Sequence, residues 1–375
     1  MFDHQDTLQQ LNKNIPLGEK LASVHKAIKK QFAAVDRIAV AIYDEKTDLL
    51  KTYIHSSGGE SPLEHYQSPL ANSPSLLQII EQRKPRVVND LSIFAQGTQE
   101  HTKRIQEQGY ASSYTMPMFL NDNFFGFVFF NSAHYDAFPQ SVLHYFDVIG
   151  HLISLLIINE QTSMRTLLAT VKTAHDMTHY RDIETGTHID RMSRYARLIA
   201  IHIADRHHLD DEYIENVFLF SPLHDLGKIA ISDDILKKRG RLSDDELTIM
   251  RTHAQKGREI IDSMMADHGL DSFENINILR NIAEYHHEAV NGTGYPNSLK
   301  GDQIPLEARI VAVADVFDAL TSRRPYKDAW SNHDAYAMLQ RLAGEKLDKE
   351  CVDALIANKD SVEQIQREFA EDQFG

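Results

Sequence analysis

The stretch Phe218-Leu219-Phe220-Ser221-Pro222-Leu223-His224-Asp225-Leu226-Gly227-Lys228 decides how the C-terminal half of the chain folds. Its apolar residues predict a buried helix over 210–224, and two metal-ligand types, His224 and Asp225, follow them directly. Burying a carboxylate is costly unless it is paired or bound to a metal. An aspartate can bridge two cations, and a neutral histidine can bind one. The stretch therefore predicts either a metal site or a buried His–Asp pair beside a helix end capped by Lys228.

A polar pair precedes this stretch in the sequence, and a single histidine follows it. Glu184 and His188 are four residues apart, so a helix over 184–204 would place both on one face. Such a pair is more often a solvated surface pair, and only neighbouring ligands favour metal binding. His253 lies on a helix expected over 243–265, which opens with a match to the capping box at Ser243-Asp244-Asp245-Glu246. Taken alone, His253 could equally be a surface histidine.

Two adjacent histidines, His286 and His287, close a helix expected over 274–288. Neighbours on a helix point about 100° apart, so these side chains suit two neighbouring metal ions better than one. The loop Asn291-Gly292-Thr293-Gly294-Tyr295-Pro296 follows. Its glycines allow close approach to a ligand, and Tyr295 offers a ring and a hydroxyl to a base or phosphate. A helix C-cap and turn would explain the same loop.

The last polar cluster lies on a helix expected over 306–321. Asp315 is surrounded by apolar residues and needs a compensating charge, and Asp318 lies near the same face, so one of the two should meet metal. The run Arg323-Arg324-Pro325-Tyr326-Lys327 could hold a phosphate, although a solvated basic turn is commoner. Histidine and carboxylate ligands without thiolates suit iron, manganese or zinc, and paired ions of this kind serve phosphoester hydrolysis.

Composition limits the classes of protein that the chain can belong to. A length of 375 residues suits two domains and a connector, and the formal net charge of −15 argues against a polynucleotide partner. The N-terminus lacks the pattern of a secretory signal, and the longest apolar run, 148–158, is shorter than the about 18 residues of a membrane span. The single cysteine, Cys351, excludes an intramolecular disulfide and fits a reducing cytosol. We therefore expect a cytoplasmic protein without membrane insertion.

The N-terminal half predicts an α+β domain. The pattern indicates helices over 17–32 and 75–83 and strands over 37–43, 49–55, 113–120 and 124–131, with a hairpin turn at Asn121-Asp122-Asn123. A long helix over 141–178 follows. Apolar residues at steps of four and three favour a two-stranded coiled coil over a connector packed on its own domain. The residues of this expected seam are Ile153, Ile157, Met164, Leu167, Val171 and Ala174.

Two family resemblances organise these pieces. His224-Asp225-Leu226-Gly227-Lys228, followed by His286-His287-Glu288 and Gly292-Thr293-Gly294-Tyr295-Pro296, resembles the HD-GYP phosphodiesterases. The order of the N-terminal elements, with Pro85-Arg86-Val87-Val88-Asn89-Asp90 and Gly109-Tyr110-Ala111-Ser112-Ser113, resembles a GAF sensory domain. The implied fold is multidomain, with a GAF-like domain over 1–150 built on a central antiparallel sheet, a helical linker over 151–180 and an all-α HD-GYP domain over 181–375.

The HD-GYP resemblance also implies the roles of individual residues. The implied metal ligands are Glu184, His188, His224, Asp225, His253, His286, His287 and Asp315. The implied substrate contacts are Lys228, Gly292, Gly294, Tyr295, Pro296, Arg324 and Lys327. Glu184 accompanies a three-metal form of the family, so three divalent ions are favoured over two, with iron first and manganese or zinc as alternatives. Asn291 and Arg239 depart from the family pattern without touching an implied ligand.

The resemblance implies hydrolysis of cyclic di-GMP to linear pGpG, with Asp225 and Lys228 as the catalytic residues, and leaves open whether pGpG is cut further to GMP. The alternatives are a 3′,3′-cyclic GMP-AMP phosphodiesterase, another HD-superfamily nucleotide hydrolase, a silent dinucleotide sensor, and a scaffold whose buried histidines are structural. The 292–296 loop argues against the wider superfamily, and the complete ligand set argues against a silent sensor. We expect regulation and homodimerisation through the 141–178 helix. The ligand of the GAF-like domain stays open, although the absence of cysteine before Cys351 excludes a thioether-linked bilin.

Overall fold

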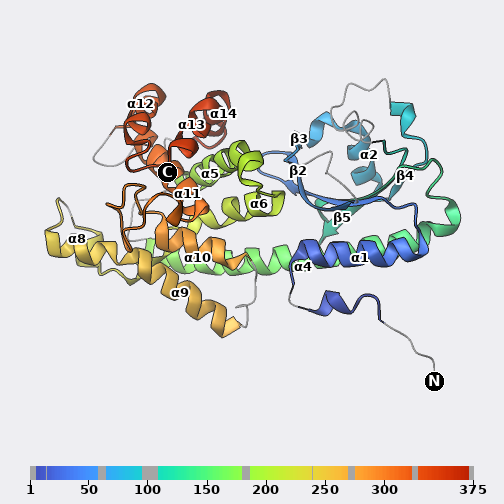
Figure 1. The fold of residues 1–375 in the computed structure, drawn as a ribbon, viewed down its shortest axis with the longest axis horizontal. Coiled ribbons are helices and arrows are strands. Elements are labelled where there is room, and N and C mark those ends of the chain that lie inside the picture. Colours follow the sequence, from blue (N-terminus) through green and yellow to red (C-terminus); the bar gives the residue numbers. More distant parts are fainter. Residues whose placement is uncertain are drawn as a thin grey trace. The chain divides into compact units, whose positions relative to one another are not determined.

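A computed structural model of the chain describes residues 6–13, 15–57, 65–94, 109–179, 186–238, 240–268, 275–322 and 328–370 (Figure 1). The chain divides into two compact units, Met1–Met164 and Arg165–Gly375. The first unit contains an antiparallel sheet with helices, and the second is built from helices.

The first unit is a six-stranded antiparallel sheet in the order β3-β2-β1-β6-β5-β4. Its strands are β1 (Arg37–Asp44), β2 (Leu49–Ser57), β3 (Gln67–Pro69), β4 (Arg86–Val88), β5 (Ser112–Leu120) and β6 (Asn123–Ser132). Its helices are η1 (Gln9–Asn12), α1 (Leu17–Gln31), η2 (Leu70–Asn72), α2 (Pro74–Gln82), η3 (Leu91–Phe94) and α4 (Gln140–His179), the last of which runs on into the second unit.

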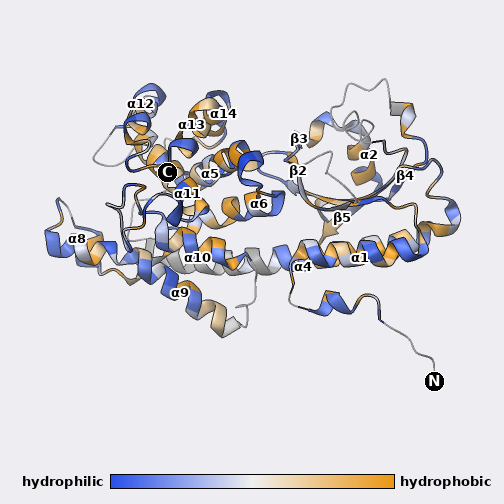
Figure 2. Cartoon of the chain, viewed as in Figure 1, coloured by the Kyte–Doolittle hydropathy of each residue, from blue (hydrophilic) through white to orange (hydrophobic). Residues whose placement is uncertain are grey.

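The sheet has apolar side chains on both faces because successive residues of a strand point to opposite sides. On β6, Val128 and Phe130 belong to the core formed with α1 and α4. Phe127 and Phe129, one residue out of phase, belong to a smaller cluster with α2. Figure 2 shows the matching apolar residues along one side of α1. The predicted α+β class and the hairpin turn at Asn121 and Asp122, both with positive φ, are confirmed.

Helix α4 buries one face in the core of the first unit. Phe146, Ile149, Ile153 and Ile157 on that face are at most 7% exposed. Ile153 and Ile157 were expected in a coiled-coil seam, and for these two residues that prediction is wrong, because they pack on their own domain. The four seam positions from Met164 to Ala174 have side chains outside the described residues.

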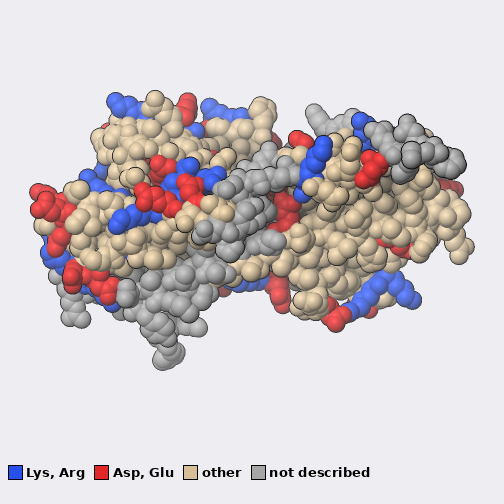
Figure 3. All heavy atoms as spheres, turned by 90° about the horizontal axis from the view of Figure 1, so that it is seen from below, with Lys and Arg blue, Asp and Glu red and all other residues tan. Residues whose placement is uncertain are grey.

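The outward face of α4 carries Val148 and Leu155, which are 56% and 66% exposed. Within the described residues, one segment, Gln140–Thr162, is long and apolar enough to cross a membrane by length and composition, with 33% of its most apolar window buried. The same composition is found in the core helix of a globular domain. Figure 3 shows broad uncharged areas on the surface of the first unit.

The described part of the second unit contains the end of α4 and a series of further helices. They are α5 (Gly186–His207), α6 (Asp211–Phe220), η4 (Ser221–Leu223), η5 (Leu226–Ala230), α7 (Asp233–Leu236), α8 (Asp244–Arg251), α9 (His253–His268), α10 (Ile276–Tyr285), η6 (Gly301–Gln303), α11 (Leu306–Thr321), α12 (Asn332–Leu342), α13 (Lys349–Ala357) and α14 (Lys359–Glu368). The predicted all-α class is confirmed, and the expected capping box joins Ser243 and Glu246 at the start of α8.

Three helix boundaries differ from the sequence-based expectation. The helix expected over 210–224 ends at Phe220, because Pro222 lacks an N–H and its ring would clash with the carbonyl of Phe218. The helix expected over 243–265 divides at Thr252 into α8 and α9. The helix expected to reach 288 ends at Tyr285, so His286 and His287 lie just beyond it.

Replacing Phe146 with alanine tests the core beneath α4. Phe146 is 0% exposed and contacts the rings of Phe130 and Phe138, so Phe146→Ala is expected to lower the stability of the first unit by about 3–5 kcal/mol. Urea unfolding is followed by circular dichroism, which reports both units, and by the fluorescence of the single tryptophan, Trp330, which reports the second. Tyr135→Ala, at a position 64% exposed, is the control and should change stability by less than about 0.5 kcal/mol. An unchanged circular dichroism transition in Phe146→Ala would contradict the packing.

Candidate metal centre

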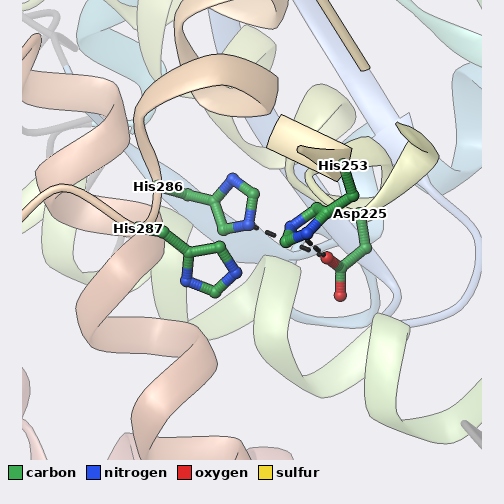
Figure 4. A group of neighbouring side chains, drawn as sticks. All are labelled: Asp225, His253, His286 and His287. Carbon is green, nitrogen blue, oxygen red and sulfur yellow. Dashed lines mark ion pairs between the residues drawn. The ribbon is translucent and has the colours of Figure 1, made fainter. Parts of the chain in front are cut away.

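Two neighbouring groups of side chains in the second unit have the composition of metal sites. Asp225, His253, His286 and His287 form one group, and His188, His224 and Asp315 form the other. Within each group, one potential ligand atom from every residue lies within 4.8 Å of the others. Figure 4 shows the rings of His253 and His286 directed at the Asp225 carboxylate. Seven of the eight predicted ligands are thus brought together, and Glu184 lies outside the described residues.

The histidines reach the centre because they stand at the ends of helices. His224 follows η4, His253 opens α9, and His286 follows α10. His286 and His287 were expected to serve two separate ions, and the structure instead places a ligand atom of each in the same group. The two rings lie with their centroids 4.0 Å apart, close enough for both to contribute to one group.

Close contact between two backbones sets the position of Asp225. Gly227 packs against α9 so tightly that a Cβ at this position would lie 1.8 Å from the carbonyl oxygen of His253 and 2.5 Å from the nitrogen of Gly257. Only glycine permits this approach without moving the backbone. As a result, His253 Nε2 lies 3.2 Å from Asp225 Oδ1.

Backbone carbonyls fix the tautomer of three histidines. The Nδ1 atoms of His224, His253 and His286 lie 2.8–2.9 Å from the carbonyl oxygens of Ser221, Met250 and Ile282. A carbonyl only accepts, so each Nδ1 must donate, and each Nε2 keeps its lone pair facing the centre. The buried Nε2 atoms of His253 and His286 make no hydrogen bond within the described residues. This donor set fits divalent metal ions.

Asp225 connects the two groups. Its Oδ1 faces His253 at 3.2 Å and His286 at 3.8 Å, while its Oδ2 lies 3.2 Å from His224 Nε2 in the other group. His224 Nε2 is also 3.9 Å from Asp315 Oδ1. The carboxylate of Asp225 therefore turns one oxygen toward each group.

Electrostatics keep these ligands in the forms that bind metal. Burial alone would raise the pKa of the Asp225 carboxyl, but the ammonium of Lys228 holds it well below its usual value. Burial lowers the pKa of His286, and burial together with His286 lowers the pKa of His287 further. The aspartate is thus ionised and these two histidines are neutral near pH 7, which are the protonation states that metal binding requires.

A second carboxylate orients His188 from behind. His188 Nδ1 donates to Asp318 Oδ2 at 2.5 Å, and Asp318 is completely buried. Arg191 Nε donates to Asp318 Oδ1 at 2.8 Å, and Ser322 Oγ donates to Oδ2 at 2.7 Å. Burial would raise the pKa of Asp318, but His188 and Arg191 lower it. Of the two aspartates left open by the helical pattern, Asp315 faces the ligand groups and Asp318 binds the histidine.

The remaining predicted site residues lie beside the first group where the structure describes them. Lys228 Nζ is 2.8 Å from Asp225 Oδ2. The ring of Tyr295 packs against the ring of His287 with centroids 4.8 Å apart, and the Arg251 guanidinium lies 5.4 Å from the Tyr295 ring. Burial raises the pKa of Tyr295, with Asp225 adding to the shift, so its phenol is neutral. Gly292, Gly294 and Pro296 belong to the same loop.

Arg324 and Lys327 lie outside the described residues, as does the departure from the family pattern at Arg239. At the other departure, Asn291 keeps the acceptor that an aspartate would supply. Its Oδ1 accepts hydrogen bonds from the backbone N–H and the hydroxyl of Thr293, at 3.0 and 2.7 Å. The asparagine therefore preserves the local turn of the loop.

Sequence reasoning missed several residues that support the ligands. Gly227 was named only as part of the His224–Lys228 motif. Its contact with α9 depends on how the helices pack, which the sequence does not show. Arg191 and Glu288 were not singled out as individual residues, although each is charged and buried. The one signal in the sequence was that each charged residue stands within three positions of a predicted metal ligand.

The second unit is mostly helical and gathers buried histidines and aspartates around the adjacent pair His224 and Asp225, which is a donor set suited to divalent metal ions. Residues 183–351 match the family described as HD domain. The chain is 44% identical over 191 residues to the cyclic di-GMP phosphodiesterase response regulator RpfG of Xanthomonas campestris pv. campestris, covering 51% of this chain and 48% of the relative.

The name of a second relative specifies a different substrate. The chain is 38% identical over 180 residues to 3′3′-cGAMP-specific phosphodiesterase 2 of Vibrio cholerae, covering 48% of this chain and 32% of the relative. The chain thus spans half or less of the length of these relatives. Among solved structures, the GAF domain of an Acinetobacter phosphoenolpyruvate-protein phosphotransferase matches 42% of this chain and 91% of its own, with 14% identity and a TM-score of 0.33.

Replacing Asp318 with asparagine tests how His188 is oriented. The amide cannot accept from His188, Arg191 and Ser322 together, so Asp318→Asn is expected to weaken metal binding at the His188–His224–Asp315 group by about 10- to 100-fold. Competition with a metal chelator, followed by elemental analysis, measures the loss. Asp302→Asn is the control, because its side chain is 98% exposed. Retention of full metal affinity in Asp318→Asn would contradict the orienting role.

Proposed function

We propose that this protein is a metal-dependent phosphodiesterase that hydrolyses a cyclic dinucleotide, with cyclic di-GMP as the first candidate. The observation that carries the proposal is the Asp225 carboxylate, which turns one oxygen toward each of two His/Asp groups. Two neighbouring metal ions of this kind suit in-line displacement at phosphorus. The names of the relatives supply the substrate class.

The residues that would hold the metals are the seven described ligands together with Glu184. Glu184 favours three ions, and the histidine and carboxylate donors favour iron, with manganese or zinc as alternatives. When bound, such ions polarise a phosphate and make water a stronger nucleophile near neutral pH. Asp225 would bridge two of them, and Asp318 would hold His188 in the orientation that ligation requires.

The substrate would be held by residues beside the first group. Lys228, whose ammonium is 2.8 Å from Asp225, would stabilise the charge that develops on the phosphoryl oxygens and supply a proton to the leaving 3′-oxygen. Tyr295, a neutral phenol packed on His287, would present its ring and hydroxyl to a base or phosphate. Arg324 and Lys327 would add phosphate contacts. The product would be linear pGpG, cut further to GMP.

The second candidate substrate is 3′,3′-cyclic GMP-AMP, which the relative from Vibrio cholerae favours. The two substrates differ in one base, so the metal centre treats their phosphates alike and the surrounding pocket makes the choice. The test uses protein purified without oxygen, which is analysed for metals and assayed with both dinucleotides. Turnover distinguishes an enzyme from a sensor, and the relative rates show which dinucleotide is preferred. Metal-loaded protein that cleaves neither dinucleotide would contradict the proposal.

We also propose a homodimer and regulation through α4. The outward residues Val148 and Leu155 are seven positions apart, so they lie on one helical face at the spacing of a heptad. The same helix runs from the first unit into the second, which gives the GAF-like unit a continuous connection to the HD domain. A cytoplasmic location accords with a cyclic dinucleotide substrate and with the single, buried Cys351.

Replacing Asp225 with asparagine tests the bridging role. An amide presents one oxygen instead of two and carries no charge, so Asp225→Asn is expected to reduce turnover by at least about a thousand-fold and to lower metal content. Turnover is measured with cyclic di-GMP, and metals by elemental analysis. Asp353→Asn, at an exposed position paired with Lys349, is the control. Full metal content with normal turnover in Asp225→Asn would show that the bridging role is wrong.

Replacing Leu155 with glutamate tests the dimer. A charge placed in an apolar interface is costly, so Leu155→Glu is expected to weaken association by about 100-fold or more. Light scattering after size-exclusion chromatography measures the mass as a function of concentration. Tyr135→Glu, at an exposed position outside α4, is the matched control. A monomeric wild-type protein, or an unchanged dimer in Leu155→Glu, would contradict the proposed interface.

A further inference from the structure

Glu288 is a buried charged residue that metal binding leaves unexplained. It directly follows His286 and His287, yet it belongs to neither ligand group and is 5% exposed. Its two carboxylate oxygens turn away to the loop that follows. Oε1 accepts from the backbone N–H of Asn297 at 2.7 Å, and Oε2 accepts from that of Leu299 at 3.0 Å.

These two bonds hold the far side of the loop that carries Tyr295. The loop is closed at its base by a backbone bridge between Asn291 and Lys300. Between these ends, Glu288 is the side chain that receives the backbone N–H groups of residues 297 and 299. Hydrogen bonds to a buried carboxylate are stronger than those between neutral groups, so the carboxylate is suited to fixing a loop without regular secondary structure.

The near side of the loop packs on the same short segment. A Cβ at Gly294 would lie 2.3 Å from the nitrogen of Ala289 and 2.5 Å from the Cα of Glu288. The N–H of Tyr295 donates to the carbonyl of His287 at 3.2 Å. The loop is therefore held from both sides by residues 287–289, and this brings the Tyr295 ring to 4.8 Å from His287.

We propose that Glu288 is a positioning residue for substrate, which acts by fixing the 291–300 loop and its Tyr295 beside the metal centre. This inference rests on the proposed cyclic dinucleotide activity for its kinetic consequence. One three-residue segment would then have two tasks, with His286 and His287 directed to the metals and Glu288 to the substrate loop. Loss of Glu288 should impair recognition of a large dinucleotide and leave the metal centre intact.

The main variant is Glu288→Gln, which has the same shape but turns an amide NH₂ toward a backbone N–H. Loss of one buried hydrogen bond to a charged group predicts a fall of about 10- to 100-fold in kcat/KM for cyclic di-GMP. Metal content and turnover of bis(4-nitrophenyl) phosphate, a small diester that does not need the loop, should stay at the wild-type level. Glu307→Gln is the matched control, because Glu307 is 7% exposed and accepts from Tyr213 and Asn281.

Two further measurements separate loop positioning from general stability. Gly294→Ala, whose Cβ would meet the backbone of Glu288 and Ala289, disturbs the loop from its other side and should also lower kcat/KM for cyclic di-GMP. In a double-mutant cycle, Tyr295→Ala should make the Glu288→Gln effect on kcat/KM much smaller, because both act through one loop. Additive losses, an equal loss on the small diester, or a fall in metal content would each overturn the proposal.

Hydrogen exchange gives a readout that needs no substrate. Glu288→Gln should speed amide exchange in residues 291–300 and leave α11 unchanged. Unchanged exchange in the loop would overturn the proposal whatever the kinetics. A wild-type protein that holds metal but cleaves neither cyclic dinucleotide would instead overturn the proposed function, and exchange together with binding of unhydrolysed cyclic di-GMP would still decide the role of Glu288.

Discussion

The buried carboxylate of Asp225 is the constraint on which the second unit depends. A carboxylate without partners would be very costly at this depth, so it needs a positive charge beside it, from a side chain or from a metal ion that neighbouring ligands would hold. Lys228 comes from the next turn of its own segment, while His253 and His286 come from elements much later in the chain. The requirement to surround one small charged group thus determines which helix ends must meet.

Helix ends suit this task because their backbone groups are incompletely paired. A carbonyl oxygen near a helix end has a second lone pair that can accept from the Nδ1–H of a histidine that follows. The carbonyls of Ser221 and Ile282 each accept two hydrogen bonds, from the backbone N–H and from the ring Nδ1–H of His224 and His286 respectively. The ring bond leaves Nε2 facing the centre. The backbone therefore fixes both the tautomer and the direction of each ligand before any ion binds.

The types of ligand could be predicted from the sequence, but the contacts that hold them could not. Histidines and aspartates that follow apolar runs predict a buried polar cluster, and the family resemblance assigns Asp315 to this cluster. The break at Pro222 was visible in the sequence, yet helical periodicity on both sides masked it. The role of Gly227 was not visible, because a glycine that allows two backbones to touch looks like any turn glycine until its partner, His253, is known.

The long helix α4 shows a different limit of prediction from sequence. Apolar residues at steps of three and four occur both in helices that pack on their own domain and in helices that pair with a partner. A buried stripe on its own domain and a seam with a partner follow the same spacing. The pattern was correctly read as amphipathic, but the phase was assigned to the wrong face: Ile153 and Ile157 pack inward, while Val148 and Leu155 face out. A helix that is apolar on both faces can serve the core of its own domain and an interface together. Because the two faces share one backbone, the proposed regulation through α4 needs no further connecting element.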